Sequence, residues 1–144
     1  NWQPNLKANS IGFTVWHALR VWDWDHYRMR AGDELYERDG WPARFGFETK
    51  GKGLYGAGFG TDFTLEDVAA MKMQSEQLLA YLAALWARTQ SYLNTVSDAT
   101  LSAEFPHPRR PEVMVVPAKI LAHTIGHSLM HIGEAQYVKG LMGT

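Results

Sequence analysis

Near the C-terminal end of the chain, residues 122–134 read AHTIGHSLMHIGE, and the interpretation of the whole sequence starts from this stretch. Histidines stand at positions 123, 127 and 131, and a glutamate follows at position 134. At about 100° per residue in an α-helix, these four side chains fall within an arc of roughly 80° on one face. Two imidazoles four residues apart can bind one metal ion together. The stretch therefore predicts a helix that carries either a metal site or a polar seam.

The composition limits the class of protein. The 144 residues are 46% hydrophobic and 20% charged, which predicts one globular domain over residues 1–144 with its own core. A formal net charge of −1 favours neither nucleic acid nor an anionic membrane as a partner, and no apolar run is long enough to span a bilayer. The chain has no cysteine, which excludes disulfides and thiolate ligands and is compatible with a reducing cytoplasmic location.

The two ends of the chain contain clear helix starts. Pro4 predicts an extended segment over residues 2–8. Ser10 is a good N-cap for a helix that runs to about residue 30. Pro117 suits the first position of a last helix that ends at about residue 142.

The middle of the chain predicts one more long helix. Residues 64–67 resemble a capping box, so a helix is predicted over residues 65–95. Residues 113–116 are the one candidate strand, and they are interpreted as a linker because no convincing partner strand is present. The sum is three substantial helices and no sheet.

Residues 39–63 form a long loop that is rich in glycine and aromatic residues, and such a loop is typical of a lid or a pocket wall. Two stretches inside it imitate known motifs. Residues 46–53 imitate a phosphate-binding P-loop, and residues 51–56 imitate a dinucleotide fingerprint. Neither has the preceding strand that these motifs need, so both are interpreted as parts of a flexible loop.

The histidines at 123, 127 and 131 are open to two interpretations. Either they form a polar seam, hydrogen-bonded to one another and to Glu134, or some of them bind a metal ion. A metal site on one face of a helix needs a third ligand from another helix, and His17 is the candidate. His26 lies nine residues after His17, on roughly the opposite face of the same predicted helix, so it cannot share that site.

Four segments carry a family resemblance. Residues 9–17 read NSIGFTVWH, residues 39–46 read DGWPARFG, residues 127–134 read HSLMHIGE and residues 137–141 read YVKGL. Together they resemble the DinB/YfiT-like superfamily over most of the chain. The resemblance implies an all-α four-helix bundle. Such bundles usually have a helix before the Asn-Ser motif, so a first helix is expected outside this sequence, or a second copy completes the bundle as a homodimer.

The resemblance also implies a divalent metal ion bound by His17, His127 and His131, with His123 as an outer neighbour. Three neutral imidazoles leave coordination positions open, as in catalytic sites. Zinc or nickel suits such ligands best, and iron is also compatible. Relatives in this superfamily include transferases and isomerases that use a low-molecular-weight thiol, so the expected partner is a small molecule whose thiol the metal activates.

Two alternatives remain open at this point. Glu134 stands where the family often has glutamine, and it is either a hydrogen-bonding partner of a ligand or the catalytic base of a metal-dependent hydrolase. In the other alternative, the chain is not an enzyme but a helical bundle that binds metal or a partner. Arg20, Arg28 and Arg44 are candidate anion contacts, although surface charge is the more ordinary role of an arginine.

Overall fold

The first long helix begins where the sequence predicts. The computed structural model describes residues 2–5 and 8–143, so the predicted extended segment over residues 2–8 lies partly outside the described residues. The side chain of Ser10 caps α1 (Ile11–Arg28) and accepts a hydrogen bond of 3.1 Å from the backbone N–H of Phe13. This bond satisfies one of the N–H groups that the first turn of a helix leaves unpaired.

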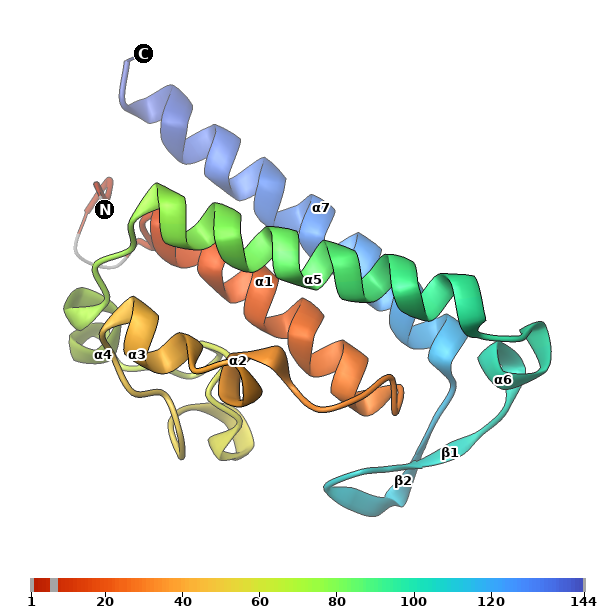
Figure 1. The fold of residues 1–144 in the computed structure, drawn as a ribbon. Coiled ribbons are helices and arrows are strands. Elements are labelled where there is room, and N and C mark those ends of the chain that lie inside the picture. The colour runs from red at the N-terminus through yellow and green to blue at the C-terminus, as the bar shows by residue number, and fades with distance from the viewer. Residues whose placement is uncertain (1, 6–7, 144) are drawn as a thin grey trace.

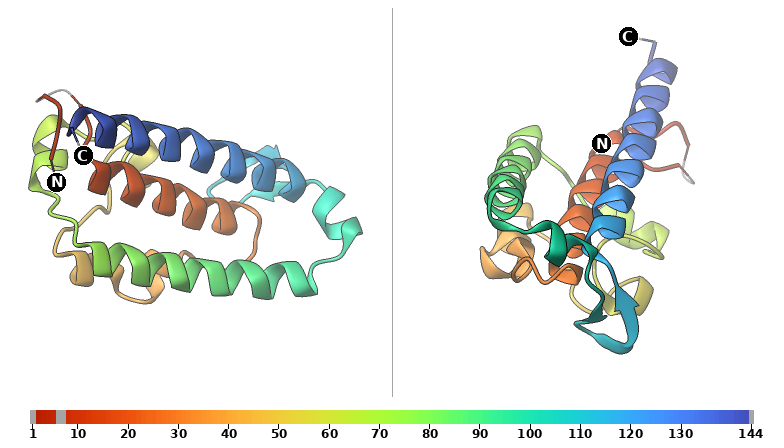
Figure 2. Two further views of the ribbon diagram at one scale, coloured as in Figure 1. Left: turned by 90° about the horizontal axis from the view of Figure 1, so that it is seen from above. Right: turned by 90° about the vertical axis from the view of Figure 1, so that its right-hand side faces the viewer.

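Three long helices dominate the described residues. α5 (Ser75–Thr95) and α7 (Pro117–Leu141) lie on either side of α1, and α1 packs against both (Figures 1 and 2). Pro117 occupies the first turn of α7, where a missing N–H removes no hydrogen bond. The all-α fold class is therefore confirmed.

The continuous helix predicted over residues 65–95 is wrong. The capping box forms as predicted and starts α4 (Leu65–Ala70), but the chain is extended at Met71 and resumes helical structure only at α5. Met71 and Met73 are both buried in the main core. Side chains two residues apart point to different sides of a helix, so an extended segment is needed to bury both on the same side of the domain.

The expectation of no sheet is also wrong. After α6 (Asp98–Ser102), β1 (Phe105–His107) and β2 (Arg110–Val115) form an antiparallel hairpin below the ends of the long helices (Figure 1). Phe105 pairs with Val115, so the missing partner of residues 113–116 is the proline-containing segment just before them. A proline is tolerated in a strand at the edge of a sheet, and in a two-stranded hairpin every strand is an edge.

The long loop has more local structure than the sequence suggests. α2 (Leu35–Arg38) precedes it, and it contains α3 (Trp41–Phe45) and a short 3-10 turn, η1 (Leu54–Gly56). Trp41 and Phe45 pack into the main core, which they share with Trp16 of α1. In the described part of the chain no strand precedes the glycine-rich segment, so the context that both imitated motifs need is missing, as the sequence predicts.

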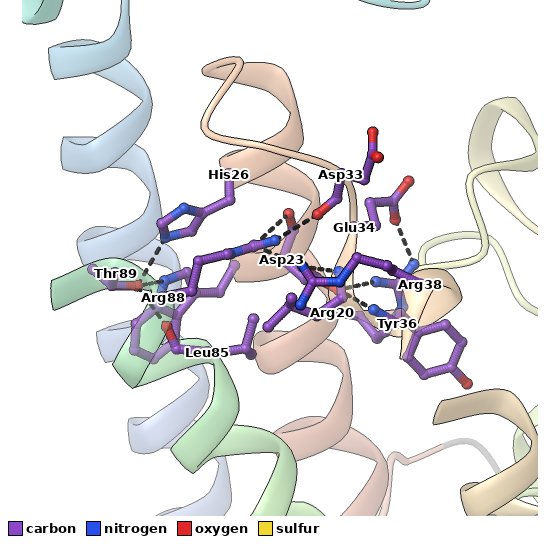
Figure 3. A network of polar contacts seen from close by, with 12 residues as sticks. Arg20, Asp23, His26, Asp33, Glu34, Tyr36, Arg38, Leu85, Arg88 and Thr89 are labelled. Atoms are coloured by element: carbon purple, nitrogen blue, oxygen red, sulfur yellow. Dashed lines mark hydrogen bonds and ion pairs between the residues drawn. The ribbon is translucent and has the colours of Figure 1, made fainter. Parts of the chain in front are cut away.

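A buried polar network ties α1 to α2 and α5 (Figure 3). Its centre is Asp23, which is fully buried. The Asp23 carboxylate accepts hydrogen bonds from the backbone N–H groups of Leu35 and Tyr36, at 2.9 and 2.8 Å. From α5, the Tyr81 hydroxyl and the Arg88 guanidinium donate to the same carboxylate at 2.6 and 2.7 Å. One carboxylate therefore joins three helices.

Arg20 belongs to this network and is not the surface charge that the sequence suggests. Its side chain is 1% exposed and pairs with Asp23 at 3.2 Å and with Glu34 at 2.8 Å. Arg44 also has a structural contact, because its guanidinium lies 4.6 Å from the centre of the Trp41 ring. Of the three arginines selected from the sequence, only Arg28 lines the cavity that His127 also lines, as described below.

An apolar groove of about 370 Å³ remains along the long helices. It is lined by Val15 and Trp22 of α1, Leu82 of α5 and Ile132 of α7. Other large apolar side chains of α5 and α7 are also exposed: Leu79, Trp86, Leu93, Ile125, Leu129, Met130 and Tyr137. None of the helices in residues 2–5 and 8–143 has the length and apolar character needed to span a bilayer.

Candidate metal centre

Three of the predicted site residues come together between α1 and α7. His17 lies on α1, and His127 and His131 lie on successive turns of α7. Their ring centres are 4.4–5.1 Å apart, and one ligand nitrogen from each lies within 4.8 Å of the other two. This is the one such group of three metal-ligating side chains among the described residues. The group is compatible with a divalent metal ion.

Hydrogen bonds orient two of the three rings. Nδ1 of His17 donates to the backbone carbonyl of Phe59 at 2.5 Å, and Nδ1 of His131 donates to the carboxylate of Glu134 at 2.6 Å. These partners assign the ring proton to Nδ1, so the lone pair of each ring lies on Nε2. Nε2 of His131 accepts a hydrogen bond of 3.1 Å from Nε2 of His127, which is the contact that the polar-seam interpretation expects. A metal ion between these two nitrogens would take the place of the shared proton, which His127 can carry on Nδ1 instead.

The surroundings keep His17 and His127 neutral. Burial lowers the pKa of His17, and the nearby His131 lowers it further against the opposing effect of the Phe59 carbonyl. Burial, together with the neighbouring His131 and His17, lowers the pKa of His127 to about 4. At pH 7 both rings are therefore deprotonated, as a metal ligand must be. The donor set fits a divalent ion without loss of protons from these two rings.

Glu134 contacts the outer nitrogen of His131 and is about half exposed. In this position the carboxylate holds the His131 ring in the orientation that presents Nε2 to the other two histidines. The geometry supports a positioning role for Glu134. Its predicted role as a catalytic base stays a prediction.

The structure separates His123 and His26 from the group. Nδ1 of His123 donates to the buried Asp25 at 2.9 Å, and Thr124 donates to the same carboxylate at 2.6 Å. His26 is buried on another face of α1 and bonds to Thr89 at 2.8 Å. The structure thus brings together His17, His127 and His131 and leaves His123 and His26 outside the group, while their role as metal ligands stays a prediction. Sequence reasoning missed Asp25, which lies about a hundred residues from its partners on α7, so that no local pattern marks it.

A cavity adjoins the histidine group on the side of the long loop. His127 and Arg28 line it, together with residues 54, 55, 59 and 61 of the loop, which confirms that the loop forms a pocket wall. The β-hairpin adds Arg109 and Arg110, which sequence reasoning missed. These arginines lie just before residues 113–116, the segment that the sequence analysis interprets as a linker, and only the hairpin brings them to the cavity.

Gly60 allows the loop to approach His17. Its φ of +105° is unfavourable for other residues, and a Cβ there would lie 2.9 Å from Nδ1 of His17. Gly60→Ala is therefore expected to displace His17 and weaken metal binding by about tenfold or more, measured by titration against a competing chelator. Gly46→Ala is the control, because Gly46 also has a positive φ, of +76°, but open space around it. Equal metal affinity in the two variants would contradict the proposed contact.

Comparison with known proteins agrees with the helical fold. The sequence profile of the DinB superfamily matches residues 1–135. The crystal structure of a conserved protein from Enterococcus faecalis is similar to this chain, with a TM-score of 0.76 and 24% sequence identity. The similarity covers 99% of this chain and 81% of that chain, and at this identity it shows the fold alone. No curated protein matches the sequence.

The fold and the site define a helical domain with a three-histidine group between two of its long helices. The chain belongs to the DinB superfamily. The resemblance found in the sequence motifs is thus confirmed, and so is the DinB-like fold class, with the two-stranded hairpin as a small addition.

Proposed function

We propose that this protein is a divalent-metal-dependent enzyme that uses a low-molecular-weight thiol as a transferase or isomerase. The observation that carries the proposal is the convergence of His17, His127 and His131, with one ligand nitrogen from each within 4.8 Å of the others. Zinc or nickel is the expected metal, because both suit imidazole, and iron is the next candidate. The thiol comes from the resemblance to the superfamily, whose members include thiol-dependent transferases.

The residues of the chain prepare the site in two ways. Burial keeps His17 and His127 neutral, so that three imidazoles leave the positive charge of a bound ion uncompensated. The Phe59 carbonyl and Glu134 fix the ring orientations before any ion binds. When bound, a divalent ion supplies a Lewis acid that favours the ionised form of a thiol sulfur.

The alternatives have less support. A hydrolase with Glu134 as its base requires a free carboxylate next to the reacting atoms, but this carboxylate accepts a hydrogen bond from the outer nitrogen of His131. A non-catalytic metal-binding bundle does not account for the cavity that His127 shares with three arginines. Both alternatives are outcomes of the experiment below.

The test uses a neutral thiol, N-acetylcysteinamide, and its S-methyl derivative as the matched control. With zinc-loaded protein, the thiol is expected to raise the melting temperature. The stabilisation is about 2.7 kcal/mol at a free thiol concentration roughly 100 times its Kd. The S-methyl compound has no ionisable sulfur, so it should give no shift, and neither compound should act on protein stripped by a chelator.

A thiol response that is absent, or equally large without metal, would contradict the proposal. Hydrolysis of a model ester that is lost in Glu134→Gln would then favour the hydrolase. A stable fold with neither response would favour the non-catalytic bundle.

We also propose that a second copy of the chain covers the apolar groove and the exposed apolar side chains of α5 and α7. The support is the number of large apolar side chains left exposed there, among them Trp86 at 55% and Leu129 at 63%. The net charge of −1 gives little repulsion between copies. Light scattering should show a dimer that Trp86→Glu converts to monomer. A monomeric wild-type protein would exclude this arrangement.

A further inference from the structure

The cavity beside the histidine group is positively charged at its hairpin end. It has a volume of about 530 Å³, and its walls come from α1, the loop, the hairpin and α7. Arg28, Arg109 and Arg110 line it, and no aspartate or glutamate does. His127 lines the same cavity, so the space that the arginines line reaches one histidine of the predicted metal centre.

The three arginines differ in how far their charge is compensated. Arg28 pairs with the buried Asp25 at 2.7 Å, and Arg109 pairs with Glu34 at 2.9 Å. Arg110 forms no ion pair within the described residues, and its guanidinium lies 4.8 Å from the centre of the Tyr55 ring. Stacking on an aromatic ring leaves the N–H groups of a guanidinium available to a ligand in the plane of the group.

His107 adds a neutral donor among these charges. It is 2% exposed, and its pKa is lowered by burial and then by the charges of Arg110, Arg28 and Arg109. Its Nδ1 accepts a hydrogen bond of 3.1 Å from the backbone N–H of Arg109, so in the neutral ring Nε2 carries the proton. His107 lines the cavity, so this part of the wall combines guanidinium groups with an imidazole N–H donor.

Apolar and aromatic side chains make up much of the remaining cavity wall. Val21 and Leu54 line it together with Trp24 and Phe59, whose ring centres lie 5.7 Å apart. Arg109 lies 4.6 Å above the Trp24 ring, so the aromatic wall directly adjoins the guanidinium groups. A small molecule with an acidic group and a flat or apolar body fits this combination of surfaces.

We propose that the cavity binds a small molecule through a carboxylate or phosphate group, with Arg110 as the main ion pair and His107 as a hydrogen-bond donor. The apolar body of the ligand lies against Trp24 and Phe59, and its opposite end lies beside His127. That this opposite end carries the reacting group rests on the proposed function. The anion site itself rests only on the arginines. The substrate class of the enzyme is thereby a small organic acid or phosphate ester.

The test is calorimetric titration with phenyl phosphate, phenylacetate and the neutral phenylacetamide, on metal-loaded and on chelator-treated protein. At least one acid is expected to bind at least about tenfold more tightly than the amide, because a charge-assisted hydrogen bond is stronger than a neutral one. Tighter binding of phenyl phosphate assigns a phosphate ligand, and tighter binding of phenylacetate assigns a carboxylate.

Arg110→Gln is expected to weaken binding of the preferred acid by about tenfold or more, since it removes the guanidinium that has no carboxylate partner. Arg44→Gln is the matched control, because Arg44 also stacks on an aromatic ring but lies outside the cavity, and it should bind the acid as the wild type does. An amide that binds as tightly as both acids, or an unchanged affinity in Arg110→Gln, overturns the proposal.

The outcomes separate this site from the proposed function. Elemental analysis should show equal metal content in Arg110→Gln and in the wild type, because Arg110 contacts none of the three histidines. Acid binding that persists without any thiol response would contradict the thiol-dependent reaction and leave the anion site standing. A thiol response without acid binding would contradict the anion site and leave the thiol-dependent reaction standing.

Discussion

Replacing His127 and His131 together by alanine is expected to reduce bound metal from about one ion per chain to background, because two of three ligands are lost. Elemental analysis of the purified protein after dialysis measures this directly. The helix should persist, since alanine has the highest helix propensity and neither histidine is a member of the main hydrophobic core. Circular dichroism checks that the variant is folded before its metal content is interpreted.

His123→Ala is the matched control for the double variant. It removes an imidazole from the same helix one turn earlier, but that imidazole donates to Asp25 and does not belong to the three-histidine group. This variant is expected to keep the metal. Full retention of metal in the double variant would contradict the site, and loss of metal in both variants would point to a general effect on α7.

Asp23→Ala is expected to destabilise the protein by about 3–5 kcal/mol, the range for removal of one partner from a buried charged pair. The change leaves Arg20 buried without one of its two carboxylates and leaves the N–H groups of Leu35 and Tyr36 without their acceptor. The expected fall in melting temperature is roughly 10 °C. Urea unfolding followed by circular dichroism measures the change in the free energy of unfolding.

Two further variants interpret that result. Asp39→Ala removes a carboxylate from an exposed pair with Arg38 and is expected to change stability by less than about 1 kcal/mol. Asp23→Asn keeps the shape of the side chain and one carbonyl acceptor, so its loss should be smaller than that of Asp23→Ala. Asp23→Ala and Asp39→Ala with equal stability would show that the network in Figure 3 does not hold the helices together.

The parts of the fold that were predictable from sequence depend on neighbouring residues. Ser10, Pro117 and the capping box at Thr64 act within one helical turn, so their helix starts were predicted correctly. The break at Met71 depends on the core in which that segment is buried, and the hairpin depends on the strand with which residues 110–115 pair. Periodicity within the segment carries no information about that partner.

The same distinction applies to the candidate site. The spacing of His127 and His131 on one helix indicates that both are candidate ligands, and the family resemblance adds His17 as the third. Asp25, Arg109 and Arg110 reach the site only through contacts between α1, α7 and the hairpin. Single residues of these types are common in any sequence, so only the fold distinguishes them.

The three histidines of the candidate metal centre come from helices at opposite ends of the chain, and on the proposed function this spacing couples metal binding to folding. In the unfolded chain His127 and His131 remain neighbours, whereas His17 is more than a hundred residues away. The complete three-nitrogen site therefore exists only in the native state, and an ion bound there shifts the equilibrium between unfolded and native chains in proportion to its affinity. On the proposed function, the free energy of unfolding therefore rises with the concentration of free metal.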